Sequence, residues 1–167
     1  MSACSRLVHY KKWADSGLYQ VVSEHLSGLE ASDAFVLLQV LDHAHAVDRI
    51  FQHHLLGKRH DYDRARSREP MDFAVLAEKV REVDDWYVDY VDALPDDRLD
   101  EQVDFFFTNG AAARMRRGDM VLHVTLHGTY HRGNVGIMLQ KNGVAPNDDR
   151  LTDFLGAESS GIQSPSR

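Results

Sequence analysis

The stretch VLHVTLHGTYHRGNVGIML, residues 121–139, combines a helical apolar pattern with three evenly spaced histidines. Apolar or histidine side chains recur every three or four residues, which places them on one face of a helix. Asp119 is a suitable N-cap and Asn142-Gly143 a suitable stop, so the sequence predicts a helix over residues 120–141. The members of the predicted face are Met120, Val124, His127, His131, Val135 and Met138.

Two histidines of this helix are suited to bind one metal ion. His127 and His131 are four residues apart, which on a helix means an offset of about 40° and one turn. His123 and His127 share this spacing, but His123 falls about 80° from His131, at the edge of the apolar face. A buried imidazole needs a partner, and a metal ion is one such partner. We therefore predict His127 and His131 as ligands, with core hydrogen bonding as the alternative.

A second predicted helix, over residues 33–56, supplies a third ligand. Ser32 or Asp33 is its expected N-cap, and Gly57 ends it. His43 is the polar member of its apolar face, whereas His45 lies on a more mixed face and His53-His54 at the helix end. The other members of that face are Val36, Val40, Val47 and Ile50.

The rest of the chain completes an all-α fold. The segment between the last two helices contains the turn dipeptide Asn109-Gly110 between short β-like runs, which predicts a hairpin. A charged connector over residues 58–70 precedes the third helix. Four helices of about 20 residues indicate a four-helix bundle. We expect one domain over residues 1–155 and a flexible Gly/Ser-rich tail over 156–167. The predicted helices cover residues 5–26, 33–56, 72–93 and 120–141.

Composition narrows the function. The 167 residues carry a net charge of −7, which argues against nucleic-acid binding because phosphate backbones are repelled. A single cysteine excludes a disulfide framework and Cys-rich zinc modules. No apolar run approaches the roughly 18–20 residues that span a bilayer, so we expect no membrane partner and a cytoplasmic location.

Three neutral nitrogen ligands leave a fourth metal position for water, which is the pattern of catalytic rather than structural sites. Nitrogen ligands suit Zn²⁺ and Ni²⁺, with Fe²⁺ and Cu²⁺ as alternatives. Such an ion can activate a bound water or thiol, or polarise a carbonyl.

Three stretches resemble the DinB family of helical-bundle metalloproteins. They are LVHYKKWADSGLYQVV (residues 7–22), LDHAHAVDRIF (41–51) and LHGTYHRGNVGIML (126–139), the last with the H-x-x-x-H-R-G element. The resemblance implies that His43, His127 and His131 are the ligands. It also implies homodimers and, from the wider superfamily, transferases or isomerases that use a low-molecular-weight thiol. It does not imply DNA binding.

Two charged side chains close in sequence to the predicted ligands are expected to point away from the metal. Arg132 points about 100° away from His131, which favours a structural ion pair over an anion contact at the site edge. Asp48 lies about 140° around the helix from His43 and is expected to point away from the metal, so no general base is identified.

The leading hypothesis is a metal-dependent transferase or hydrolase that acts on an unidentified small electrophile. The alternatives are a non-catalytic metal-binding stress-response protein and a dimeric interaction bundle.

Overall fold

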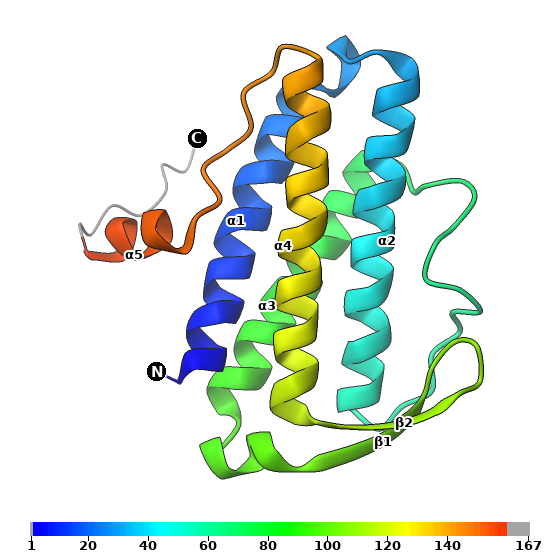
Figure 1. The fold of residues 1–167 in the computed structure, drawn as a ribbon, viewed down its shortest axis with the longest axis vertical. Helices are drawn as coiled ribbons and strands as arrows, with labels where there is room; N and C mark the ends of the chain where they lie inside the picture. The colour runs from blue at the N-terminus through cyan, green and yellow to red at the C-terminus, as the bar shows by residue number, and fades with distance from the viewer. Residues whose placement is uncertain (1, 160–167) are drawn as a thin grey trace.

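The computed structural model describes residues 2–159, which form four long helices, a small hairpin and a short fifth helix (Figure 1). The mainly helical architecture and the hairpin agree with the sequence prediction, but the fifth helix was not expected. The helices are α1 (Ala3–His25), α2 (Ala31–Leu55), α3 (Phe73–Ala93), α4 (Arg117–Lys141) and α5 (Leu151–Ser159), with 3₁₀ turns η1 (Leu26–Gly28) and η2 (Asp96–Asp100) and strands β1 (Gln102–Phe106) and β2 (Ala112–Arg116).

The four long helices lie side by side, and each contacts two of the others. Helix α4 packs against α2 and α1, and α3 packs against the same two helices from the other side. As the colours of Figure 1 show, α1 and α4 run toward one end of the molecule and α2 and α3 toward the other. The connector between α2 and α3 therefore runs back along the outside of the helices. The contact of α2 with α4 is what brings their histidines together.

Acidic side chains begin two of the helices. Glu30 accepts hydrogen bonds from the backbone amides of Ser32 and Asp33, so Glu30 is the N-cap of α2 and the predicted Ser32 or Asp33 cap is wrong. Asp72 caps α3 in the same way.

Helix α4 starts two residues before its predicted cap. Asp119 lies in the first turn, where a carboxylate interacts favourably with the helix dipole, and Arg116 is the N-cap without a side-chain bond. The reason is that β2 leads directly into α4, and the Arg117 amide donates to the Glu101 carbonyl at 3.0 Å.

The predicted stops are found at two glycines. Gly57 and Gly143 have φ of 64° and 75°, a left-handed conformation that L residues with side chains rarely adopt. Both follow the last turn of a long helix, so the ends of α2 and α4 are set by local sequence.

The hairpin closes one end of the helices. Strand β1 pairs antiparallel with β2, with Phe105 opposite Ala113. Phe105 is buried and its ring lies 6.0 Å from that of Phe51 on α2. The hairpin thus covers the end of α2, as Figure 1 shows.

A polar layer divides the hydrophobic core into two parts. One part lies near the hairpin and includes Phe51, Tyr87 and Met120; the other lies toward the opposite end and includes Leu18 and Leu139. Buried polar side chains fall at sequence positions between these two sets or directly at the edge of the first: Lys11, Asp15, His45, His131 and Arg132 lie between them, and Asp48 and Asp84 directly follow Val47 and Val83. The middle of the protein is therefore where its chemistry is concentrated.

Helix α5 packs against α1 through Phe154, whose ring contacts Tyr10 and Trp13. Residues 156–159, which the sequence analysis assigned to the tail, form the end of this helix. The remaining tail, residues 160–167, lies outside the described residues. No helix within residues 2–159 is long and apolar enough to cross a membrane.

Candidate metal centre

The three predicted ligands lie together between α2 and α4. One ring nitrogen of each of His43, His127 and His131 falls within 4.8 Å of those of the other two. His131 is buried, and the other two are half-buried. His123 is exposed and stacks on His127 from one turn away, with 5.7 Å between ring centroids. Within the described residues this is the one cluster of three or more metal-binding groups, and we call it the candidate metal centre.

The spacing of the two α4 ligands fits a shared ion. The Nε2 atoms of His127 and His131 are 3.1 Å apart. Two nitrogens bound tetrahedrally to one zinc ion at about 2.0–2.1 Å lie about 3.3–3.4 Å apart. The observed separation is therefore only a few tenths of an ångström shorter than that expected for two ligands of one ion.

The connector orients the third ligand. His43 Nδ1 lies 2.7 Å from the carbonyl oxygen of Ala65, and because a carbonyl only accepts, Nδ1 carries the proton. The lone pair is then on Nε2, free to bind a metal. Such a contact from the second ring nitrogen is the usual way in which a protein fixes the tautomer and orientation of a ligating histidine.

Burial keeps the two α4 ligands neutral. It lowers the pKa of His127 to about 3, with further lowering from His131 and His43. It lowers the pKa of His131 to about 4, with further lowering from His43 and Arg66. Neutral imidazole is the form that binds metal, so both rings are ready to bind near pH 7 without first losing a proton.

A buried ion cluster lies beside the candidate metal centre. Lys11 is 2 % exposed, and its Nζ contacts Asp15 Oδ2 at 2.8 Å, Asp48 Oδ2 at 2.8 Å and Asp84 Oδ1 at 2.5 Å. The three carboxylates come from α1, α2 and α3. All three N–H groups of this ammonium are therefore used, and one side chain ties three helices together.

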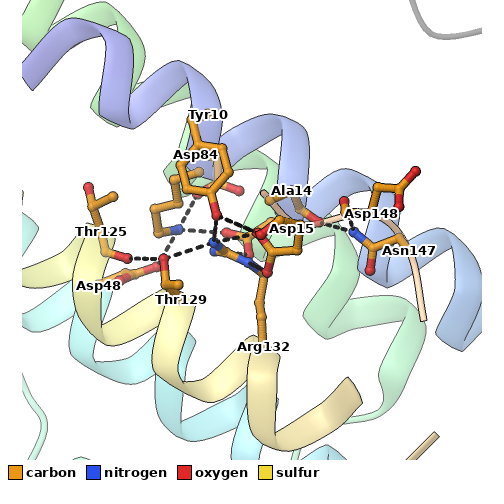
Figure 2. Close-up of polar contacts among 12 residues, drawn as sticks. Tyr10, Ala14, Asp15, Asp48, Asp84, Thr125, Thr129, Arg132, Asn147 and Asp148 are labelled. Carbon is orange, nitrogen blue, oxygen red and sulfur yellow. Dashed lines mark hydrogen bonds and ion pairs between the residues drawn. The ribbon is translucent and has the colours of Figure 1, made fainter. Parts of the chain in front are cut away.

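Arg132 extends the ion cluster toward α5. Its guanidinium contacts Asp15 Oδ1 at 3.0 Å and Asp149 Oδ2 at 2.8 Å, and Figure 2 shows it reaching from α4 to α1. It also donates to Thr129 at 3.0 Å. This is the structural ion-pair role that the sequence favoured over an anion contact. The ion cluster thus consists of Lys11 and Arg132 with Asp15, Asp48, Asp84 and Asp149.

The carboxylates of the ion cluster differ in their proton affinity. Burial raises the pKa of Asp48 to about 6 and that of Asp84 well above its usual value, although Lys11 opposes both shifts. Burial acts on Asp15 as well, but Lys11 and Arg132 together lower its pKa below the ordinary value. The difference follows from the second cation, Arg132, because Asp15 is the one carboxylate of the three around Lys11 that also contacts it.

The ion cluster was missed because charged residues occupy core positions. The periodicity of the first helix predicts an apolar face of Leu7, Tyr10, Ala14, Leu18 and Val21. Tyr10, Ala14 and Leu18 are indeed buried, but the prediction omits Val8 and Lys11, which are buried as well. The sequence did contain one signal of the ion cluster. Lys11 and Asp15 are four residues apart within an apolar helical pattern, a spacing that lets them form an ion pair on the same face.

Asp48 and two histidines also lie deeper than expected. The Asp48 side chain points into the core, where it forms an ion pair with Lys11. His45 and His54, which were assigned to a mixed face and a helix end, are 3 % and 8 % exposed.

The fold and the candidate metal centre define a mainly helical protein with three inward histidines on two neighbouring helices. The sequence model of the DinB family matches residues 1–163, essentially the whole chain, and the chain belongs to the DinB family. A search of curated proteins found no match.

Proposed function

We propose that this DinB-family protein binds a divalent metal ion through His43, His127 and His131 and acts as a metal-dependent enzyme. The observation that supports the proposal best is the ligand geometry, with His127 and His131 Nε2 atoms 3.1 Å apart and His43 held by Ala65. Zn²⁺ or Ni²⁺ fits this nitrogen donor set. Family membership supports the same assignment.

The chain's own residues would hold the ion and leave room for a reactant. His127 and His131 supply two nitrogens from one helix, and His43 supplies a third from α2. When bound, the ion would act as a Lewis acid that activates a water or thiol. The hydrogen bond to Ala65 keeps the His43 ring in one orientation. Within the described residues no fourth protein ligand joins this cluster, which favours an open coordination position.

The class of reaction is proposed from the family resemblance. A transferase that joins a low-molecular-weight thiol to a small electrophile would use the open position for the sulfur. We also propose that the four long helices form a four-helix bundle of the DinB type and that the protein is a homodimer.

A non-catalytic, cross-linking role for the ion is the alternative, and the placement of the ligands on two helices supports it. The ligands come from α2 and α4, so a bound ion would cross-link two helices. In this case metal removal would lower the melting temperature strongly, and exchangeable ligands at the ion would be absent.

Metal content tests the site. Untagged protein analysed by inductively coupled plasma mass spectrometry should carry about one ion per chain. His43→Ala and His127→Ala should lose it, and His123→Ala, one turn away and exposed, should retain it. If the protein held no metal and could not be reconstituted with Zn²⁺ or Ni²⁺, the site would be disproved, and an N–H···N hydrogen bond would explain the His127–His131 distance.

Turnover tests the enzyme. Metal-loaded protein should consume a chromogenic electrophile in the presence of a low-molecular-weight thiol, and the His43→Ala variant should not. A loaded protein without turnover, but with a melting temperature that depends on metal, would establish the cross-linking role instead.

A further inference from the structure

A small cavity lies next to the candidate metal centre, inside the polar layer. Its volume is about 20 Å³. Side chains from all four long helices line it, so it lies among the helices that carry the ligands and the ion cluster. The lining residues that matter here are Lys11, Ala44, His45, Asp48, Gly128 and His131.

Three of these residues carry a buried polar atom that has no hydrogen-bond partner among the described residues. The atoms are His45 Nδ1, Asp48 Oδ1 and His131 Nδ1. His45 and Asp48 are each 3 % exposed, and His131 is 8 % exposed. Lys11 cannot satisfy Asp48 Oδ1, because its three N–H groups already contact Asp15, Asp84 and Asp48 Oδ2. Buried polar atoms in proteins are nearly always paired, so a partner is needed at this place.

We propose that the cavity binds one water molecule that links the metal ligand His131 to the Asp48 carboxylate. A buried water requires a volume of about 10–15 Å³ and two to four polar partners. The cavity offers about 20 Å³ and three unpaired polar atoms, so it meets both conditions. The water would accept from His131 Nδ1–H and donate to Asp48 Oδ1 and His45 Nδ1. This arrangement uses both hydrogens of the water and pairs all three atoms.

The water gives Asp48 a positioning role for the metal centre, and this part of the inference rests on the proposed function. Ligating histidines commonly donate their second ring N–H to a carboxylate, a carbonyl or a water. His43 does so directly, to Ala65. His131 would do so through the water, and Asp48 is itself held by Lys11. Asp48 thereby becomes the member of the ion cluster that supports a metal ligand.

A matched pair of variants separates this role from general stability. In Asp48→Asn the amide oxygen can keep the contact with Lys11, so the amide N–H₂ faces the cavity. This group donates where the carboxylate oxygen accepted, and it therefore cannot accept the hydrogen bond from the water. Asp84→Asn removes a carboxylate from the same Lys11, but Asp84 does not line the cavity. Both residues are equally buried, so their effects on folding should be similar.

The readout is zinc affinity by chelator competition, with the absorption spectrum of the Co²⁺-loaded protein as a second measure. Asp48→Asn should weaken zinc binding about 10–100-fold, the range seen when outer partners of ligands are lost. It should also shift the Co²⁺ spectrum. Asp84→Asn should stay within about threefold of wild type. Equal losses in both variants, or none in Asp48→Asn, would overturn the positioning role.

Ala44→Val provides a second test if Asp48→Asn does not fold. The substitution changes no charge, and its two additional methyl groups narrow the cavity from the side of α2. It should weaken zinc binding in the same direction. Unchanged affinity in a folded Ala44→Val protein would count against the water link.

The water itself is tested without metal. A crystal structure of the metal-free protein at high resolution should show one ordered water within hydrogen-bond distance of Asp48 Oδ1 and His131 Nδ1. A dry cavity would overturn the proposal. If wild-type protein bound no zinc but held the water, the proposed function would fail while the water site stood.

Discussion

At the scale of residues, a few buried charged side chains determine how the helices of this core pack together. Lys11 sits at a position where the helical pattern calls for an apolar residue, and it contacts carboxylates from α1, α2 and α3. A buried cation is tolerated only when such partners surround it. The residue therefore ties three helices at one point of the polar layer.

Replacing Lys11 by methionine should destabilise the protein by about 3–5 kcal/mol, because buried carboxylates lose their cation. The measurement is the free energy of unfolding in urea. The neighbouring Lys12 provides the control, since its pair with Asp85 is about half exposed and its removal should cost less than about 1 kcal/mol. Similar losses for Lys11→Met and Lys12→Met would contradict the role assigned to the ion cluster.

His54 should make stability depend on pH. Burial, with His60 and His53 nearby, lowers its pKa from 6.5 to about 4. Between these values the unfolded chain binds a proton that the folded protein excludes. The free energy of unfolding should therefore fall as the pH falls from about 6.5 to 4, by no more than about 1.4 kcal/mol per pH unit from this residue.

Urea unfolding of metal-free protein between pH 4 and 7 checks this slope. His54→Gln should show a shallower decline than wild type, whereas a substitution of the exposed His25 should leave it unchanged. A decline as steep in His54→Gln as in wild type would assign the effect to other groups.

At the scale of elements, short segments position the long helices and their side chains. The connector has no helix of its own, yet the Ala65 carbonyl fixes the His43 ring. The hairpin places Phe105 against the end of α2. The connector thus contributes directly to the candidate metal centre, whereas the hairpin packs against the end of α2.

Helix α5 should contribute measurably to stability through one side chain. Phe154 is 6 % exposed and its ring centroid lies 6.1 Å from Tyr10 and 5.9 Å from Trp13. Phe154→Ala should cost about 3 kcal/mol in urea unfolding and expose residues 151–159 to limited proteolysis. Leu151→Ala on the same helix should cost under about 1 kcal/mol, because Leu151 is 37 % exposed and lies outside the buried cluster around Phe154. Unchanged proteolysis in Phe154→Ala would show that α5 is held by other contacts.

At the scale of the whole molecule, the outer face of α4 supports the proposed homodimer. Leu126, Tyr130 and Ile137 are each about two-thirds exposed, at 66 %, 68 % and 67 %. Their spacing places them on one face of the helix, and at Gly133 between them the space where a Cβ would lie is open. A second copy of the chain could approach this face closely.

Ile137→Glu should convert the dimer to a monomer, because a charge in an apolar interface loses its hydration without gaining a partner. Light scattering coupled to size exclusion measures the mass. Val75→Glu, at an exposed apolar position on α3, is the control and should remain dimeric. A monomeric wild type, or a dimeric Ile137→Glu, would refute this interface.

Local sequence determined a large part of the fold. Helical periodicity, the Asn109-Gly110 turn and the stops at Gly57 and Gly143 depend on residues a few positions apart, so they could be identified without the rest of the chain. The pairing of His127 with His131 is local for the same reason, since a spacing of four residues fixes their relation on any helix.

The tertiary structure alone decided which polar side chains are buried and what they contact. Lys11 and Arg132 find carboxylate partners on α2, α3 and the segment before α5, far from them in the sequence. The Ala65 carbonyl reaches His43 only because the connector runs back along α2. The physical reason is that a buried charge or imidazole is stable only with partners, and these partners come from segments that the local pattern does not relate.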